Sequence, residues 1–320
     1  MFTTLLRKVT DRTVALEHFL GLYNPGAATV KHREDHIFRH SAVMTQLYNI
    51  YESFSESVLS LWLSRLPRYG LFPDLSEQFR NAYRSGIARI IKNIDKRQYR
   101  HLSLVDILTV YLNSLQGNAS WELVNDALTS HDANLRRSQF DSMFSSVGLD
   151  NIWHLLETNP IIATHLAETD AHESLEQMLL NLVNFRNDAS HGTPDEILGL
   201  DTLTEWIWFV RTFCNALVDV VTHRIVSAEA EHRPLSVLGV VTDTFSNNVL
   251  VATCQRGPFR VGDNIYFLRD ADCKLASIES LQMNGIDKEE VQIDGNSVEV
   301  GFRTSIKIHR NARLVRIEDP

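Results

Sequence analysis

The sequence has little of what marks a secreted or membrane-spanning protein. Its three cysteines (Cys214, Cys254 and Cys273) are scattered and form neither a disulfide framework nor a C-x-x-C metal knuckle. A reducing, cytoplasmic location is therefore expected. No apolar run approaches the ~20 residues that a membrane span needs. The N-terminal stretch carries charges from Arg7 to Arg12, where a signal peptide would be apolar, so we expect an amphipathic helix there.

An excess of basic residues is also missing. The formal net charge of -9 argues against a general DNA-coating protein, because such proteins are usually basic. It still permits an enzyme that acts on RNA through one local basic patch. The candidate patch contains Arg89, Lys92, Lys96, Arg97 and Arg100. The same spacing also fits a solvated helix face, so both interpretations stay open.

Several common catalytic motifs are absent from the sequence. It contains no P-loop, no G-x-G-x-x-G after a predicted strand and no G-x-S-x-G elbow. No internal repeat is visible either. Any catalytic activity must therefore depend on residues outside these motifs, and no cofactor is expected.

The length of 320 residues fits two domains better than one. Residues 1–226 show apolar residues at three- and four-residue spacings, which predicts an all-α bundle. We interpret residues 227–235 as a linker, because Ser227 to Pro234 form a short polar stretch ending in proline. Residues 236–320 hold short β-branched runs separated by Asn/Gly turns, which predicts a small all-β barrel or sandwich.

Within the helical part, long helices are expected over residues 33–66 and 201–225, and Asp74 and Ser76 are candidate N-caps for a helix that follows the first of these. Shorter helices are expected around 104–115, 120–128, 135–144 and 150–157. A further helix should begin near residues 171–174 and stop at Gly192, because glycine readily ends a helix. Thr193 and Glu196 fit a capping box for the next one.

The end of that helix carries the most informative residues, Arg186, Asn187 and His191. On a continuous helix, Arg186 and His191 would lie about 140° apart, but the helix stop lets the histidine turn toward the arginine. An arginine can hold a phosphate bidentately, and a histidine can move a proton near neutral pH. Asn187 is a candidate for orienting either the phosphate or the histidine. Two cations favoured by a helix C-terminus are the other interpretation.

Two further groups deserve a prediction. Glu52 lies in an otherwise apolar helix face, so it is either a surface residue or a partner for Arg186. His32, His36 and His40 recur every four residues, which is compatible with a metal site. No H-E-x-x-H motif or cysteine supports a metal there, so exposed or RNA-facing histidines are expected and no metal ligand is assigned.

The helical part resembles the HEPN superfamily, whose signature is R-x(4–6)-H with a polar residue often following the arginine. The residues RNDASHG (186–192) fit that form. The similarity extends to HIFRHSAVMTQLYNIYESF (36–54), which looks like the first long helix of one HEPN branch. NLRRSQFDSMFSSVGL (134–149) resembles the segment that precedes the motif helix.

This resemblance implies a helical bundle that forms a homodimer, with two motifs facing each other in one cleft. It also implies a metal-independent endoribonuclease that leaves a 2′,3′-cyclic phosphate and serves as a toxin or phage-defence effector. His191 would be the general acid/base, Arg186 the phosphate ligand, and Asn187 and Glu52 supporting residues. RNA, possibly structured RNA such as tRNA, would be the partner, with an antitoxin or defence-system protein as another.

Two alternatives remain on the sequence. Some HEPN domains are inactive scaffolds, so a non-catalytic RNA-binding or interaction subunit is the second hypothesis. A metal-dependent hydrolase built on the histidine stripe is the third.

The C-terminal part is similar to the second-domain β-barrel of translation GTPases. The resemblance rests on residues 238–270, including the Val261-Gly262-Asp263 turn. Because that barrel contacts RNA in translation factors, it implies that this domain helps to recognise RNA or a partner.

Overall fold

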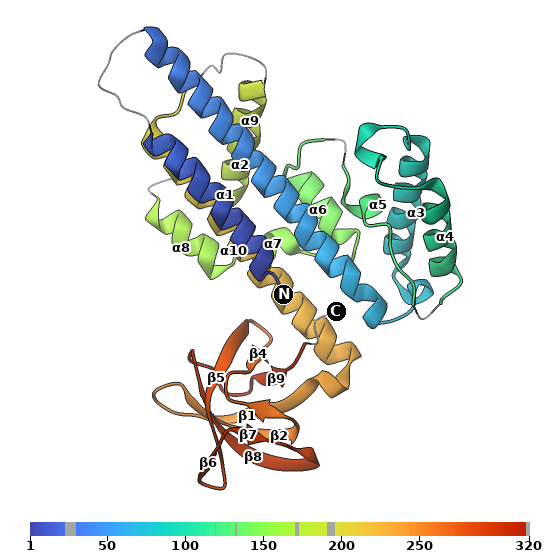
Figure 1. Ribbon diagram of the computed structural model, residues 1–320, viewed down its shortest axis with the longest axis vertical. Helices are drawn as coiled ribbons and strands as arrows, with labels where there is room; N and C mark the ends of the chain where they lie inside the picture. The colour runs from blue at the N-terminus through green and yellow to red at the C-terminus, as the bar shows by residue number, and fades with distance from the viewer. Residues whose placement is uncertain (23–29, 119, 132, 170–172, 191–195, 318–320) are drawn as a thin grey trace. The chain divides into compact units, whose positions relative to one another are not determined.

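The computed structural model describes residues 1–22, 30–118, 120–131, 133–169, 173–190 and 196–317, with the side chains at 30–33 left aside. The chain divides into two compact units, Met1–Val220 and Val221–Pro320, and the division falls inside helix α10. The first unit is helical and the second is mainly β (Figure 1). The expected fold class, a helical bundle followed by a small β-barrel, is confirmed.

The helical unit is built on α2, which runs from Val30 to Arg65. Its buried face includes Val43, Leu47 and Tyr51, at the spacing that predicted this helix. Helices α1 and α9 both pack against α2 (Figure 1). The remaining helices of the unit and their bounds are α1 Thr3–Gly21, α3 Glu77–Lys92, α4 Leu104–Leu115, α5 Asp126–Thr129, α6 Arg137–Ser145, α7 Ile152–Glu157, α8 Pro160–Glu168, α9 Leu175–Ser190 and α10 Leu200–His232, with short 3-10 turns η1 Leu66–Arg68, η2 Phe72–Asp74 and η3 Arg97–Tyr99.

Helix starts follow the local sequence. The Ser76 hydroxyl accepts a hydrogen bond from the Phe79 N–H at 3.2 Å, as expected for an N-cap. The helix expected at 120–128 is much shorter, because α5 covers only Asp126–Thr129. The residues before α5 are tied to distant groups instead: the Trp121 indole donates to the Gly70 carbonyl, and the Val124 N–H donates to the Tyr83 hydroxyl.

The polar linker expected at 227–235 is largely helical, since α10 continues to His232. The alanines and glutamates in this stretch favour a helix, and Glu229 pairs with Arg233 at 2.9 Å. Val226 and Ala230 are buried against Leu268 and Val315 of the second unit, to which this part of α10 belongs. Pro234 then begins the 3-10 turn η4, Pro234–Ser236.

The second unit is a closed barrel. Its strands pair in the order β4-β9-β1-β2-β8-β5, and β5 also pairs with β4, so the sheet returns on itself. Each of these pairs is antiparallel. The strand bounds are β1 Val237–Thr244, β2 Val249–Arg256, β3 Phe259–Arg260, β4 Asn264–Leu268, β5 Cys273–Met283, β6 Ile286–Lys288, β7 Glu290–Val291, β8 Asp294–Thr304 and β9 Arg313–Val315.

Alternate residues of these strands fill the barrel with a single apolar core that includes Leu250, Ala252 and Cys254 of β2. Two hairpin turns have positive φ at both central residues: Asn247 and Asn248, then Asn284 and Gly285. Asn and Gly are the residues that tolerate this conformation, which is why the turns could be located from the sequence.

In the described part of the chain, none of the helices is both long and apolar enough to cross a membrane.

Candidate functional site: the Arg186 cluster

Arg186 lies on α9, whose buried stripe, including Leu179, Leu182 and Val183, faces the core. Its guanidinium carbon lies 4.9 Å from the centre of the Tyr48 ring on α2. Its Nη1 donates to the side-chain oxygens of Asn134 at 3.3 Å and Asn187 at 3.2 Å. The Asn134 amide in turn donates to the Asn187 oxygen at 2.9 Å. An aromatic face and two amides therefore fix the orientation of the guanidinium.

The described side chains that contact the Arg186 guanidinium, Tyr48, Asn134 and Asn187, are all neutral. Among the residues that the structure describes, no carboxylate forms an ion pair with it. Its Nε is buried without a hydrogen-bond partner in that part of the chain. A half-buried guanidinium with spare donors and no counterion is suited to bind an anion, and a phosphate matches its planar fork.

Tyr48 connects this arginine to the rest of the site. Its hydroxyl accepts the Leu135 N–H at 2.8 Å and donates to Glu52 Oε1 at 2.7 Å. Burial raises the pKa of the Tyr48 phenol, so the hydroxyl stays protonated and can keep donating at neutral pH. The ring supports Arg186 while the hydroxyl anchors the segment that carries Asn134.

Glu52 does not form the expected ion pair with Arg186. Tyr48 lies between the two, and Glu52 accepts the Tyr48 hydroxyl instead. The Glu52 side chain is 28% exposed and has His131 Nε2 at 3.7 Å, so water and the imidazole stabilise it without a direct bond to Arg186. The hydrogen bond from Tyr48 therefore links Glu52 to the Arg186 cluster only indirectly.

His131 is part of the cluster and was missed from the sequence. Its Nε2 lies 3.4 Å from Glu56 Oε1 and 3.7 Å from Glu52 Oε1, and its Nδ1 lies 2.6 Å from the Ala133 carbonyl oxygen. The Glu56 carboxylate is the main cause that raises the pKa of His131. The glutamates lie one turn apart on α2, a spacing that could have suggested a cation between them.

His191, the expected general acid/base, lies outside the described residues, as do Gly192, Thr193 and Pro194 of the expected helix stop and cap. The described part of α9 ends at Ser190. The pairing of Arg186 with His191 therefore remains a prediction.

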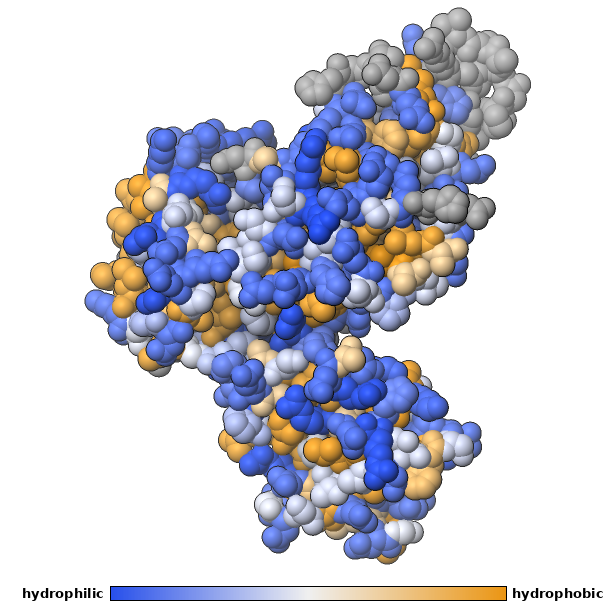
Figure 2. All heavy atoms as spheres, turned by 180° about the vertical axis from the view of Figure 1, so that it is seen from behind, coloured by the Kyte–Doolittle hydropathy of each residue, from blue (hydrophilic) through white to orange (hydrophobic). Residues whose placement is uncertain are grey.

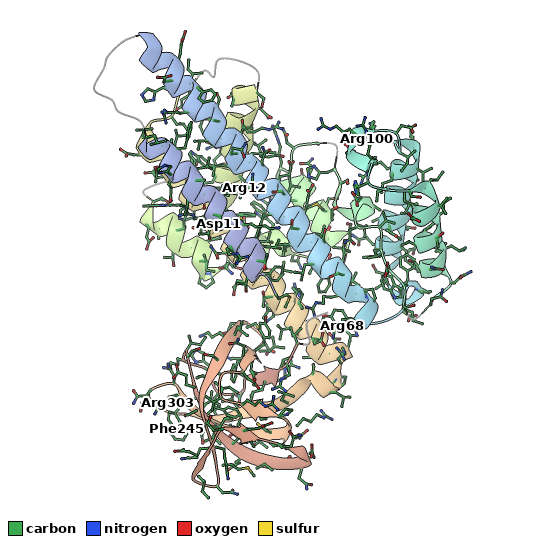
Figure 3. All side chains as sticks on the ribbon, viewed as in Figure 1. Asp11, Arg12, Arg68, Arg100, Phe245 and Arg303 are labelled. Atoms are coloured by element: carbon green, nitrogen blue, oxygen red, sulfur yellow. The ribbon has the colours of Figure 1, made fainter. Side chains whose placement is uncertain are left out.

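The expected basic patch divides into two parts. Lys92, Lys96, Arg97 and Arg100 are exposed at the end of α3 and around η3, and Arg100 points away from the ribbon in Figure 3. Arg89 is half-buried instead, and its Nη2 donates to the carbonyl oxygens of Asp126 at 3.5 Å and Ala127 at 3.4 Å.

Within the histidine stripe, His36 is half-buried and His40 is buried. His40 is fully buried, and its Nδ1 accepts the Leu198 N–H at 3.2 Å. That bond occupies the lone pair which a metal or RNA donor would need, and burial lowers the pKa of His40. The expectation of an exposed or RNA-facing histidine is wrong at this position. The side chain of His32 is not among those described. Among the described residues, no group of His, Cys, Asp or Glu is arranged to hold a metal ion.

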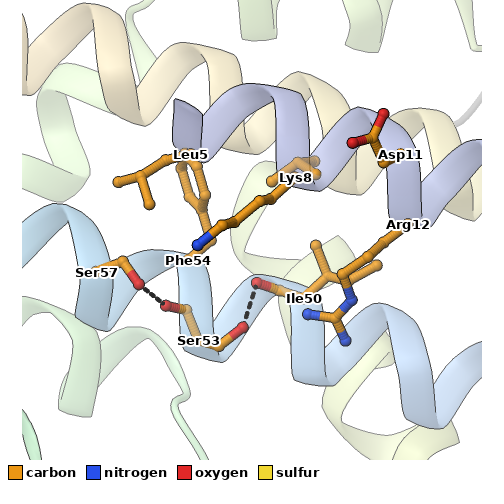
Figure 4. Close-up of a pocket in the computed structure, with 9 residues that line it drawn as sticks. Leu5, Lys8, Asp11, Arg12, Ile50, Ser53, Phe54 and Ser57 are labelled. Atoms are coloured by element: carbon orange, nitrogen blue, oxygen red, sulfur yellow. Dashed lines mark hydrogen bonds between the residues drawn. The ribbon is translucent and has the colours of Figure 1, made fainter. Parts of the chain in front are cut away.

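A separate hollow of about 240 Å³ lies between α1 and α2 (Figure 4). Lys8 and Arg12 extend over a floor that includes Ile50 and Phe54. The Ser53 hydroxyl at its edge donates to the carbonyl of Asn49 at 2.6 Å within its own helix. The hollow offers an apolar floor with charges at the rim and no arrangement for proton transfer among its described lining residues.

Comparison with known proteins places the helical unit. Residues 3–229 match the family described as MAE_28990-like HEPN. No curated protein matches the chain. Two crystal structures are similar over part of it: the C-terminal domain of a putative U32 peptidase from Geobacillus thermoleovorans, and the selenomethionine variant of that domain. The domain itself is 15% identical to this chain, with 26% of this chain and 94% of its own length covered and a TM-score of 0.24. Its selenomethionine variant is 16% identical, with 25% of this chain and 98% of its own length covered and a TM-score of 0.22. The expected similarity of the barrel to translation GTPases stays a prediction.

Proposed function

The chain belongs to the MAE_28990-like HEPN family through residues 3–229, and on that basis we propose that its helical unit is a metal-independent endoribonuclease. The observation that carries the proposal is the guanidinium of Arg186, which is held in place by Tyr48 and two amides and has no carboxylate to neutralise it among the described residues. A phosphodiester supplies a negative charge and two non-bridging oxygens that can accept hydrogen bonds from the guanidinium.

In the proposed reaction, His191 takes the proton of a ribose 2′-hydroxyl. The 2′-oxygen forms a bond to the adjacent phosphorus, and the bond from phosphorus to the 5′-oxygen breaks. The departing 5′-oxygen receives a proton from a histidine, so the products are a 2′,3′-cyclic phosphate and a 5′-hydroxyl. Arg186 stabilises the charge that gathers on the phosphoryl oxygens. Asn187 orients Arg186, and Glu52 acts through Tyr48.

Cleavage of RNA by the purified protein tests this proposal. Arg186→Ala should lower kcat about a hundredfold or more, because it removes the group that stabilises the transition-state charge. His191→Ala should be at least as severe, and EDTA should leave wild-type activity unchanged. The matched control is Arg84→Ala, an exposed arginine on α3, which should cleave like the wild type. Loss of activity in EDTA, or full activity in Arg186→Ala, would contradict the mechanism.

We propose that the barrel helps to recognise RNA or a partner. Phe245 is 56% exposed, and its N–H donates to the Val249 carbonyl at 2.7 Å. Val249 pairs across the sheet with Arg303, which is also exposed. Figure 3 labels both side chains on this unit. An exposed ring close to an exposed cation can stack a base and contact its phosphate.

The biological role that we propose is a cytoplasmic toxin or phage-defence effector that works as a homodimer and is held in check by an antitoxin or another defence-system protein. Brief overexpression tests this role. The wild type should arrest growth, while Arg186→Ala and His191→Ala should be tolerated. Equal tolerance of wild type and variants would contradict it.

The second candidate is a non-catalytic interaction scaffold, and one observation favours it. Helix α4 exposes five large apolar side chains along one side: Leu104, Val105, Leu108, Leu112 and Leu115. Apolar side chains also gather over parts of the helical unit in Figure 2. Exposed apolar stripes of this kind mark protein–protein contacts. A scaffold would be tolerated on overexpression in all three forms.

A further inference from the structure

A second cavity in the helical unit lies among α3, α5 and α6 and has a volume of about 380 Å³. Polar groups dominate part of its wall, with Arg89, His131, Ser130 and Ser142 among them, while Leu128 and Met143 form an apolar part. No aspartate or glutamate is among the described residues that line it. In a chain with a net charge of -9, a cavity with a guanidinium and no carboxylate in its described lining favours an anion over a cation.

Several donors in this cavity have no hydrogen-bond partner among the described residues. The Nε of Arg89 is buried and has no hydrogen-bond partner in the described chain. Its Nη2 reaches the Asp126 and Ala127 carbonyls only at 3.5 and 3.4 Å, which are long bonds. The hydroxyls of Ser130 and Ser142 likewise make no bond to any described residue. A buried guanidinium nitrogen without a partner is costly, and a bound phosphate oxygen would remove that cost.

The cavity is joined to the Arg186 cluster by one short segment. His131 lines the cavity and also contacts Glu52, which orients Tyr48 beneath Arg186. Asn134, three residues later, accepts a hydrogen bond from Arg186. Three residues span at most about 10 Å, a distance that one or two nucleotides of an RNA strand can cover. A strand with its scissile phosphate on Arg186 thus has a neighbouring nucleotide near the cavity.

We propose that this cavity is a subsite for a nucleotide that flanks the cleaved bond in a single-stranded stretch of RNA. The phosphate of this nucleotide binds Arg89 and the free serine hydroxyls, and its base packs on the wall formed by Leu128 and Met143. The exposed cations Lys92, at the end of α3, and Lys96, Arg97 and Arg100, around η3, would then continue the path of the strand. This inference rests on the proposed ribonuclease function, because that function defines the strand.

Binding of a short 2′-O-methyl RNA to the full-length protein tests the subsite separately from cleavage, since that RNA has no free 2′-hydroxyl to react. Ser142→Glu places a carboxylate in the carboxylate-free wall, and Ser142 is exposed, so the fold should tolerate it. Arg89→Gln removes the cation. Each should raise Kd about tenfold or more, as expected for loss of a charge-assisted bond to phosphate. Fluorescence anisotropy measures the change.

Thr109→Glu on α4 is the charge-matched control, because Thr109 is exposed and does not line the cavity. Its Kd should stay within about twofold of the wild-type value. Wild-type affinity in Ser142→Glu and Arg89→Gln, or an equal loss in Thr109→Glu, overturns the subsite. If cleavage of ordinary RNA is never seen but the two cavity variants still weaken binding selectively, the ribonuclease proposal fails while the nucleotide site stands.

Discussion

Tyr48 is the residue on which the geometry of the Arg186 site depends. Its ring supports the guanidinium, and its hydroxyl holds both the Leu135 backbone and the Glu52 carboxylate. Since burial raises its pKa, this residue keeps the same hydrogen bonds throughout the neutral range. The residue of the cluster whose charge changes near neutral pH is therefore His131, which contacts Glu52, the hydrogen-bond partner of Tyr48.

His131 should make the stability of the helical unit depend on pH. The groups that face it are the Glu52 and Glu56 carboxylates of α2 and the Ala133 carbonyl oxygen, all of which favour the charged imidazole. Its pKa is raised in the folded protein, so its stabilising contribution is complete below the unfolded value of about 6.5 and is lost as pH rises through the folded value.

Comparison of wild type with His131→Gln measures this contribution. The difference in the free energy of unfolding between the two proteins should be largest below the unfolded value of about 6.5 and should shrink as the pH rises above it. Urea titrations at several pH values give that difference directly. His40 and His165, whose pKa values are lowered by burial, act with the opposite sign, but they are present in both proteins and cancel. A difference that grows with pH would contradict the assignment.

At this scale the sequence located Arg186, Asn187 and Glu52 correctly in one region, because the first two are adjacent and the third lies on the helix against which α9 packs. It could not locate Asn134 or His131. Their contacts with Arg186 and Glu52 join residues more than fifty positions apart, and no local spacing encodes such a pairing. The pairing of Glu52 with Arg186, one of the two interpretations that the sequence allowed, does not form, because Tyr48 contacts each of them instead.

At the scale of elements, α3 and α5 approach each other closely because Gly86 of α3 has no side chain. A Cβ added at Gly86 of α3 would lie 1.9 Å from the carbonyl oxygen of Ala127. Only glycine permits this distance. The carbonyls of α5 are consequently within reach of Arg89, which lies on the next turn of α3.

Gly86→Ala should therefore destabilise the protein, although alanine is the better helix former. The methyl group must push α5 away, and overpacking of this kind costs about 1–3 kcal/mol. Gly21→Ala is the control, because Gly21 ends α1 and nothing lies within 4 Å of an added Cβ. That change should be neutral or slightly stabilising. Chemical denaturation compares the two, and equal stability of both variants would rule out the steric explanation.

The boundaries of the elements show where local signals suffice. Helix α4 lies where apolar periodicity placed it, at Leu104–Leu115. Helix α8 was overlooked despite a local signal, because the Asn159 side chain caps the Ile161 N–H at 2.9 Å and Pro160 occupies the first helical position. The short α5 could not be foreseen, since Trp121 and Val124 are held by groups more than forty residues away.

At the scale of the whole molecule, the proposed homodimer determines how the active site is composed. One Arg186 and one His191 per chain would place two motifs in a single cleft, so that the active site is complete only in the pair. Closed twofold assemblies of this kind place the same surface of both chains at the interface. Every described residue of the Arg186 cluster lies in the first unit, Met1–Val220.

Mixing of wild-type and Arg186→Ala chains tests the shared cleft. If both motifs are needed and the chains exchange freely, activity should fall with the square of the wild-type fraction, so an equal mixture retains about a quarter of the wild-type activity. Chains that act independently would retain about half. The mixture is assayed after dissociation and reassociation, with His154→Ala, an exposed position on α7, as the mixing control that should leave activity unchanged. A strictly linear dependence, or a monomer in analytical ultracentrifugation at the assay concentration, would contradict the two-chain site.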